Sequence, residues 1–232
     1  MESPAWPPTS DEFQASAAGP SAPGVSAHQV HRVLGISYKS TWFMMHRLRE
    51  AMRTGLEPFG GAGKVVEAGE TYFGNTEEAR VSLLATVALQ RQRRRSQQAS
   101  HPALIERGGN VGSFHILPAA GQYAAQEIVK EYIAKESHLH TDESKLYKGM
   151  NDHFTHETVK HTANEYVHGN VTTNTIESYF SIFKRGTRGT YQHCAGKHLH
   201  RYLAEFDFRH NDRTALGVND TMRAETSAAA SD

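Results

Sequence analysis

Two acidic residues, Asp142 and Glu177, are separated by 34 residues and stand where the sequence pattern changes. Asp142 ends a short segment, 138–142, that predicts a strand, and Glu177 lies near the start of a segment, 175–186, that predicts a helix. Lys184 follows Glu177 by seven residues, which places both on roughly the same helix face. The fold must therefore present two carboxylates from a strand end and a helix start.

The remaining patterns predict a mixed sheet. Residues 64–68 read as a strand, and 103–106 with 111–117 read as a hairpin around the turn R-G-G-N, because glycine and asparagine supply positive φ angles. Residues 122–135 and 197–209 have helical spacing. The order of strand, hairpin, helix, strand and helices predicts an α/β fold with helices that flank a mixed sheet.

Residues 28–53 predict two short helices joined by a tight turn. The first ends at Leu34, Gly35 suits the turn, and Ser37 can cap a second helix over 38–52. This segment, extended to 28–56, resembles a helix-turn-helix. An ordinary helical hairpin packed on a neighbouring element remains the alternative interpretation.

Charge is balanced overall but uneven along the chain. The formal net charge is zero, whereas residues 28–53 carry five Lys or Arg against one acid and residues 178–213 carry seven against three. Such local basic faces can bind phosphate backbones. Cys194 is the only cysteine, so neither an internal disulfide nor a cysteine-rich zinc site is expected. Without a membrane-length apolar run or a signal-peptide pattern, we expect a cytoplasmic protein that does not bind membranes.

Three segments do not fit a compact domain. Residues 1–27 and 214–232 are rich in small or polar residues, and we expect a disordered lead-in and a disordered tail. Residues 76–102 contain a Gln/Arg/Ser block and predict an aberrant loop, read either as a solvated loop or as a basic arm that binds DNA. This loop is either an insertion or a frame-shifted stretch of the gene, which translating the coding DNA in other frames would distinguish.

Several longer phrases resemble one family. They are G-I-S-Y-K-S-T-W-F-M-M-H-R-L-R-E-A-M, V-V-E-A-G-E-T-Y-F-G, H-T-D-E-S-K-L-Y, T-N-T-I-E-S-Y-F-S-I-F-K-R-G and H-L-H-R-Y-L-A-E-F-D-F-R-H-N-D-R. Together they resemble the ISXO-like group of bacterial insertion-sequence transposases. The resemblance implies a ribonuclease H-like DDE domain over 62–213 and two divalent cations, Mg²⁺ or Mn²⁺. It also implies terminal-repeat and target DNA as partners, and a homodimer within a synaptic complex.

The resemblance also assigns roles to residues. Asp142 and Glu177 would each hold a metal ion, and Lys184 would contact the substrate phosphate. The family's first strand reads V-E-x-D-E-T-Y, and here Gly69 stands in the place of its aspartate. Two neighbouring acids could substitute for this aspartate. Glu67 shares a strand face with Gly69, whereas Glu70 would point to the other face, so Glu67 is the better placed of the two. It is still a weak substitute, because it lies two positions, roughly 6–7 Å, away along the strand. In a plainer interpretation, Asp142 is a helix cap and Glu177 a solvated helix residue.

These residues predict an insertion-sequence transposase whose DNA strand cleavage and transfer are impaired. The residues expected to contact DNA come from the two basic segments and are Lys39, Arg47, Arg49, Lys184, Arg185 and Arg188. The alternative is a non-catalytic remnant that recognises the element ends by binding alone, and a third interpretation is the translation of a pseudogene.

Overall fold

A computed structural model describes residues 24–53, 55–72, 100–116, 121–159, 171–192, 194–213 and 217–229. Residues 1–23, which make up most of the predicted lead-in, lie outside the described residues. So do residues 76–99 of the predicted aberrant loop.

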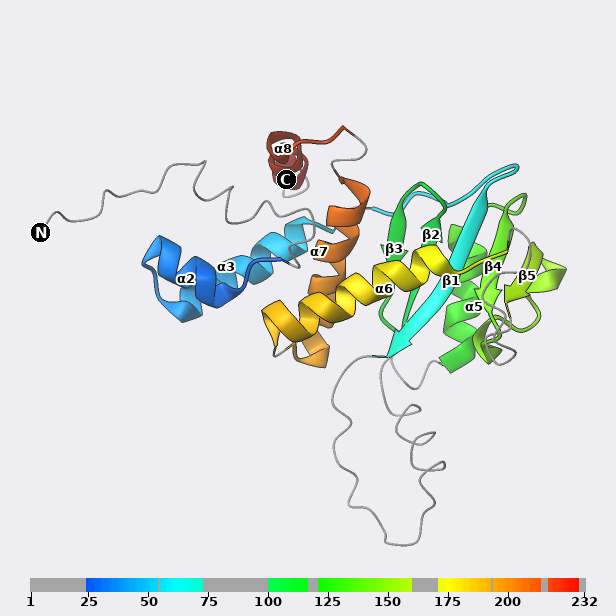
Figure 1. The fold of residues 1–232 in the computed structure, drawn as a ribbon, viewed down its shortest axis with the longest axis horizontal. Coiled ribbons are helices and arrows are strands. Elements are labelled where there is room, and N and C mark those ends of the chain that lie inside the picture. Colours follow the sequence, from blue (N-terminus) through cyan, green and yellow to red (C-terminus); the bar gives the residue numbers. More distant parts are fainter. Residues whose placement is uncertain are drawn as a thin grey trace, which may run out of the picture.

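Five strands form one mixed sheet in the order β3-β2-β1-β4-β5 (Figure 1). They are β1 (Val65–Tyr72), β2 (Ser100–Glu106), β3 (Val111–Ser113), β4 (His138–Asp142) and β5 (Thr155–Val159). β1 pairs antiparallel with β2 and parallel with β4, while β3 is antiparallel to β2 and β5 parallel to β4. The predicted α/β fold with a mixed sheet is confirmed, and its strand order is that of the ribonuclease H-like fold.

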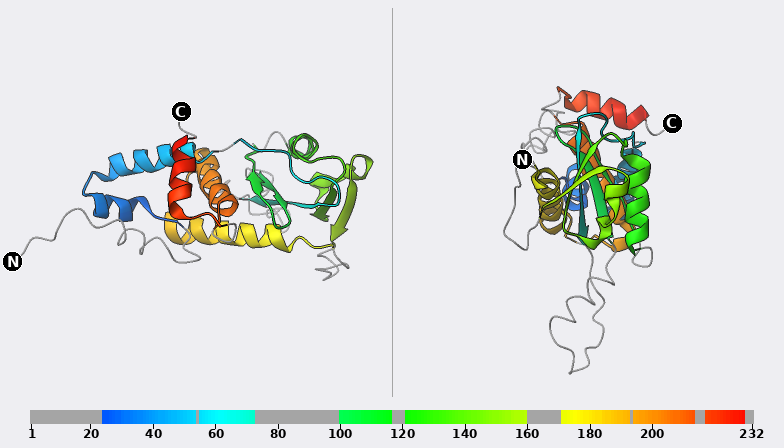
Figure 2. Two further views of the ribbon diagram at one scale, coloured as in Figure 1. Left: turned by 90° about the horizontal axis from the view of Figure 1, so that it is seen from above. Right: turned by 90° about the vertical axis from the view of Figure 1, so that its right-hand side faces the viewer.

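The α-helices of the described residues lie on both faces of this sheet and beyond one end of it (Figure 1). They are α2 (Ala27–Leu34), α3 (Tyr38–Ala51), α5 (Gly121–Tyr132), α6 (Asn174–Gly186), α7 (Leu199–Asn211) and α8 (Asp220–Ala229). Shorter helical turns are η1 (Lys145–Tyr147), η2 (Met150–Asp152), the π-helical η4 (Thr187–Tyr191) and η5 (Gly196–His198). α6 lies on one face of the sheet and α5 on the other (Figure 2).

Two apolar cores follow from the alternation of side chains along the strands. On the α6 and α7 side, the core comprises Ala103, Ile105, Val111, Ile176, Tyr179, Phe180, Phe183, Leu199, Tyr202, Leu203 and Phe206. On the α5 side, it comprises Phe59, Val66, Ala68, Leu104, Val129, Ile133, Leu139, Tyr147, Met150 and Phe154. β1 contributes to the second core through Val66 and Ala68, so its odd-numbered residues face α6.

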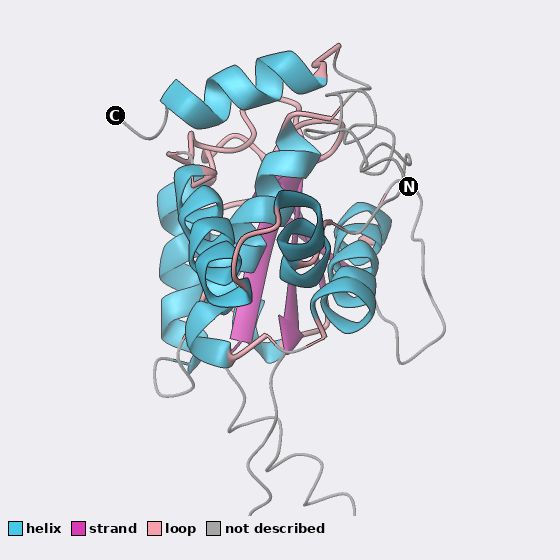
Figure 3. Ribbon diagram, turned by 90° about the vertical axis from the view of Figure 1, so that its left-hand side faces the viewer, coloured by secondary structure: helices cyan, strands magenta, loops and turns pink. Residues whose placement is uncertain are grey.

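The predicted pair of N-terminal helices is present. Ser26 caps α2 by accepting a hydrogen bond from the Gln29 backbone N–H, and Gly35 ends α2 with φ +64°. Ser37 then caps α3 by accepting a hydrogen bond from the Ser40 N–H. The two helices extend beyond the end of the sheet (Figure 1), so that helices stand in front of the strands when the molecule is seen from that side (Figure 3). α3 packs against α7. Their interpretation as a helix-turn-helix stays a prediction.

Arg49 connects α3 to α7 and is not available to DNA. The residue is 3% exposed, and its guanidinium lies 2.7 Å from the Glu205 carboxylate and 4.4 Å from the ring centre of Tyr202. The predicted contact of Arg49 with DNA is therefore disfavoured, because its charge is already paired inside the helix–helix contact. Arg49 lies on the face of α3 that α7 covers, and only the packing of the two helices shows which face that is.

Three predicted boundaries also change. The predicted disordered tail contains α8, whose start is capped by the Asn219 side chain accepting from the Met222 N–H. Residues 100–102, predicted as loop, open β2, where His101 is fully buried opposite Thr71. The lead-in ends earlier than expected, because Ala27 already belongs to α2. Among the described residues, no helix has the length and apolar character needed to cross a membrane.

Buried histidines make the stability of this fold dependent on pH. Burial is the main cause that lowers the pKa values of His46, His101 and His210 to about 4. An unfolded chain binds these protons near pH 6.5, so between pH 6.5 and 4 it binds more protons than the folded chain. We therefore expect the midpoint of urea unfolding to fall as the pH is lowered through this range.

One buried acid opposes this trend, and a variant isolates the effect. Burial raises the pKa of Asp207 to about 6, so the folded chain binds this proton more readily than the unfolded chain and gains stability as the pH falls. The three histidines lose stability over the same range and outnumber this one acid. In His46→Phe, the aromatic contacts with Trp42 and Tyr202 can persist without a titrating ring. The urea-unfolding midpoint of this variant should fall less on acidification than that of the unmodified chain. The same fall in both proteins would show that His46 does not contribute to the pH dependence.

Candidate active site

Asp142 and Gly69 occupy neighbouring positions at the carboxyl ends of two parallel strands. β1 and β4 pair up to Ala68 opposite Thr141, and Gly69 and Asp142 are the next residues on the two strands. Asp142 is half-buried, and its Oδ1 accepts a hydrogen bond from the Ser144 N–H at 3.1 Å. Asp142 thus shapes the turn after β4 and stands beside Gly69, but the N-cap of the helical turn that follows is Ser144 and not, as the capping interpretation supposed, Asp142.

Helix α6 closes the space above Gly69. A Cβ atom at residue 69 would lie 3.2 Å from both Cγ atoms of Ile176 and 3.4 Å from a ring carbon of Phe180. The backbone does not require glycine here, because Gly69 is absent from the residues with positive φ. A larger residue is therefore compatible with the backbone only if Ile176 shifts by a few tenths of an ångström.

Glu177 is presented by the first turn of α6. The inward face of this helix carries Ile176, Tyr179, Phe180 and Phe183, which leaves Glu177 exposed on another face. Thr173, the N-cap residue, donates from Oγ1 to the Glu177 carboxylate at 3.0 Å, and its carbonyl accepts the Glu177 N–H at 3.1 Å. These two bonds hold the side chain and the backbone of Glu177 at the helix start.

Glu67 fastens the start of α6 to β1. Its carboxylate is fully buried and accepts the N–H groups of Thr175 at 2.9 Å and Ile176 at 3.1 Å, together with the Thr175 hydroxyl at 3.0 Å. Arg107, from the turn between β2 and β3, lies 3.0 Å from the same carboxylate. A carboxylate on free helix N–H groups is favourable because those groups carry partial positive charge.

This position changes the interpretation of Glu67. We predicted it as a weak substitute for the missing metal ligand because it shares a strand face with Gly69. The shared face is correct, but the carboxylate oxygens are used by α6 and by Arg107. The substitute role is therefore disfavoured, because binding a metal ion would remove the anchor of the helix that carries Glu177.

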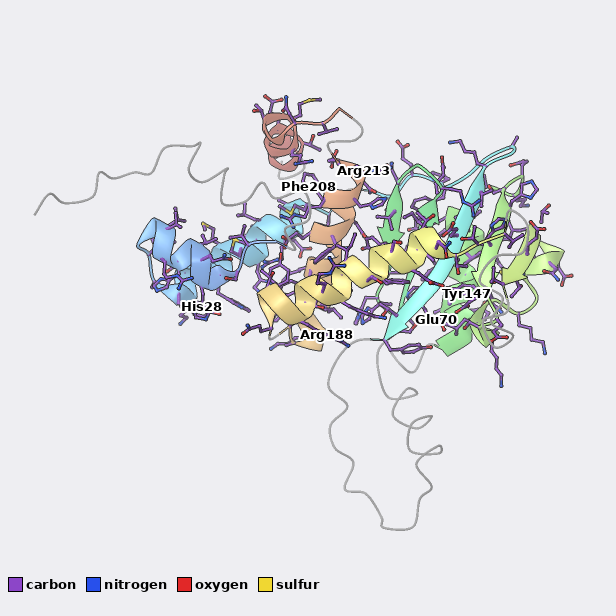
Figure 4. The ribbon with its side chains drawn as sticks, viewed as in Figure 1. His28, Glu70, Tyr147, Arg188, Phe208 and Arg213 are labelled. Atoms are coloured by element: carbon purple, nitrogen blue, oxygen red, sulfur yellow. The ribbon has the colours of Figure 1, made fainter. Side chains whose placement is uncertain are left out.

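The cationic residues of α6 lie farther along the helix. Lys184 is half-buried, and burial followed by the nearby Arg188 lowers its pKa. Arg185 and Arg188 are exposed, and Arg188 lies at the end of α6 that extends away from the sheet (Figure 4). α6 thus carries one acid at its start and two cations, Lys184 and Arg185, towards its end, and Arg188 follows in η4.

A protein-family model described as the ISXO2-like transposase domain matches residues 61–211, from just before β1 to the end of α7. The chain belongs to the ISXO2-like transposase domain family. No curated protein sequence matches the chain. Members of this family are DDE transposases, which act on DNA and generally use divalent metal ions.

The family's full two-metal set does not fit this site. Gly69 offers no oxygen, and the space where its side chain would start is closed by Ile176 and Phe180. Within the part of the chain that the structure describes, no group of three or more His, Cys, Asp or Glu side chains is arranged to hold a metal ion. The described residues thus offer Asp142 and Glu177 as acids at this edge of the sheet, with Gly69 beside Asp142.

Sequence patterns missed two residues that organise the site. Arg107 was read only as part of a hairpin turn, and nothing local indicates that it reaches Glu67 on the neighbouring strand. Ser144 was read as part of a helix after Asp142, although it contacts both Asp142 and Glu70. The phrase D-E-S contains the signal for a turn capped by Asp142, but the contact with Glu70 depends on strand pairing.

We expect Glu67→Ala to lower the free energy of unfolding by about 3 kcal/mol, since it leaves buried helix N–H groups and Arg107 without their acceptor. Urea denaturation measures this change. Glu67→Gln retains an oxygen that can accept the α6 N–H groups and should lose less. An alanine variant as stable as the unmodified chain would show that Glu67 does not anchor α6.

Proposed function

We propose that the chain is a transposase-family protein whose metal-dependent DNA strand cleavage is absent or very weak. The observation that carries this proposal is Gly69, which occupies the place of the family's first aspartate and lies beneath Ile176. In enzymes of the two-metal type, the two ions activate the attacking oxygen and stabilise the leaving one. A chain without the shared carboxylate retains Asp142 and Glu177 but lacks the charge that neutralises both ions.

Restoring the aspartate tests this proposal. A duplex that carries the element's own terminal repeat is incubated with the full chain and Mg²⁺ or Mn²⁺, and strand cleavage is followed by gel electrophoresis. We expect no cleavage by the unmodified chain and detectable cleavage by Gly69→Asp, because the new carboxylate lies beside Asp142. Robust cleavage by the unmodified chain would refute the proposal.

A matched variant separates chemistry from packing. Gly69→Ala adds the same Cβ next to Ile176 but no carboxylate. We expect it to remain inactive, and thermal unfolding of both variants shows how much stability the contact costs. Cleavage by the alanine variant would mean that packing, and not a metal ligand, limits the activity.

A second function, DNA binding without cleavage, is favoured by the exposed basic residues of α3. Lys39 and Arg47 are exposed at positions eight residues apart, and Phe43 between them is 63% exposed. Residues spaced in this way share one helix face. α3 uses its other face, with Arg49 and His46, to pack against α7. The free face therefore combines two cations with an aromatic ring, a combination that suits a phosphate backbone and its bases.

The end of α6 adds further cations to this proposal. Arg185 and Arg188 are exposed, and Lys184 is half-buried beside Arg188. α6 starts over the sheet and runs towards the side of the molecule on which α2 and α3 lie (Figures 1 and 2). We propose the terminal repeats and target DNA as the ligands of these residues, with a homodimer joining two element ends.

Variants of α3 test the binding function. We expect Lys39→Ala and Arg47→Ala each to weaken binding to terminal-repeat DNA and to reduce the slope of log affinity against log salt by about one. Fluorescence anisotropy over a salt series measures both quantities. Arg49→Met is the control, because it removes a cation that is buried and should change stability rather than the salt slope. If the salt slope of every variant equals that of the unmodified chain, Lys39 and Arg47 do not contact the DNA backbone.

A further inference from the structure

Phe43, in the middle of α3, keeps a large apolar side chain in contact with water. Its exposed fraction is 63%. The preceding residue, Trp42, instead packs against the buried ring of His46, with 4.1 Å between the two ring centres. Burial of the Phe43 ring against a ligand would remove apolar surface from water and would therefore be favourable.

One cation lies a helical turn before Phe43 and another lies a turn after it. Lys39 precedes the ring by four residues, Arg47 follows it by four, and both are exposed on roughly the same face of α3. Residues 24–49 contain no Asp or Glu, and the first acid that follows, Glu50, is engaged in hydrogen bonds with arginines. This face is thus apolar at its centre and positive at both ends, which suits a polyanion with an apolar group between its charges.

The spacing of the two cations matches the major groove of DNA. Eight residues at a rise of about 1.5 Å separate Lys39 and Arg47 by about 12 Å along the helix, and the groove is about 12 Å wide. Their long side chains can reach phosphates on both sides of the groove while Phe43 faces the base edges between them. α2 and α3 extend beyond the end of the sheet, so the sheet does not obstruct this approach (Figure 1).

A phenyl ring has a narrow choice of contacts on the base edges of this groove. It has no hydrogen-bond donor or acceptor for the polar atoms that the bases present there. The apolar group in the major groove is the C5-methyl of thymine, and phenylalanine is among the side chains that contact it. Stacking of the ring between bases would first require them to be unstacked, at an energetic cost that the methyl contact does not have.

We propose that Phe43 is a specificity-determining residue of α3, which recognises the methyl group of a thymine in the major groove of the terminal repeat. This inference rests on the proposed binding of DNA by α3 and adds to it the base that is recognised. Lys39 and Arg47 supply affinity that does not depend on the base sequence, whereas Phe43 favours thymine.

Deoxyuridine tests this proposal, because uracil differs from thymine only in lacking the methyl group. The element's terminal-repeat duplex is made once with thymidine and once with deoxyuridine at every thymidine position. Fluorescence anisotropy at one salt concentration gives the affinity of the full chain for each duplex. We expect the unmodified chain to bind the uracil duplex about fourfold more weakly for each methyl group that Phe43 contacts. In Phe43→Ala, the ratio of the two affinities should fall towards one.

Two further variants serve as controls. Lys39→Ala should weaken binding to both duplexes equally and keep the ratio, because a phosphate contact does not distinguish thymine from uracil. Tyr123→Ala removes another exposed ring, 72% exposed on α5, and should leave the ratio unchanged. Thermal unfolding verifies the fold of each variant, and the comparison of the two duplexes with the unmodified chain needs no variant.

Equal affinity of the unmodified chain for the two duplexes would overturn the inference, and so would a ratio that Phe43→Ala leaves unchanged. If Phe43→Ala converts a dimer to a monomer in light scattering and leaves the ratio unchanged, the face binds a second copy of the chain and the inference is wrong. Absence of binding to both duplexes would instead refute the proposed DNA binding itself, so the two failures are distinguishable.

Discussion

The buried carboxylate of Glu67 holds the two halves of the site together. It joins the middle of β1 to the first N–H groups of α6, and Arg107 from the β2–β3 turn completes the contact. Three segments that are distant in the sequence thus meet at one charge. Because an unpaired buried charge is strongly destabilising, each partner limits how far the others can move. The position of Glu177 in space follows from this anchor.

The same helix placement explains why Gly69 matters. With α6 fastened by Glu67, Ile176 comes to lie against residue 69, so the position that we propose as that of the family's aspartate is bordered by an apolar contact. The neighbouring acid, Glu70, faces the other side of the sheet and joins Ser144 and Asp142. The acidic residues at this edge of the sheet therefore have different partners: Glu67 is bound by α6 and Arg107, whereas Glu70 and Asp142 are joined through Ser144.

Some of the basic residues of α3 are buried in helix packing, whereas others are exposed to solvent. Arg49 was grouped with Lys39 and Arg47 because they share a basic segment, yet only Arg49 is buried against Glu205 and Tyr202. Helical spacing alone shows that Arg47 and Arg49 face different directions, but it does not show which face α7 covers. The tail was misread for a related reason, because its Ala-rich composition fits both a disordered segment and the helix α8.

The sequence by itself determined the family, the α/β class and the positions of Asp142 and Glu177 on a strand end and a helix start. Those inferences depend on local periodicity and on long matching phrases, which survive without knowledge of contacts. Only the tertiary structure decided that Glu67 anchors a helix, that Ile176 covers Gly69 and that Glu70 meets Ser144. Each of these contacts joins residues more than 70 positions apart, and strand pairing and helix docking bring them together.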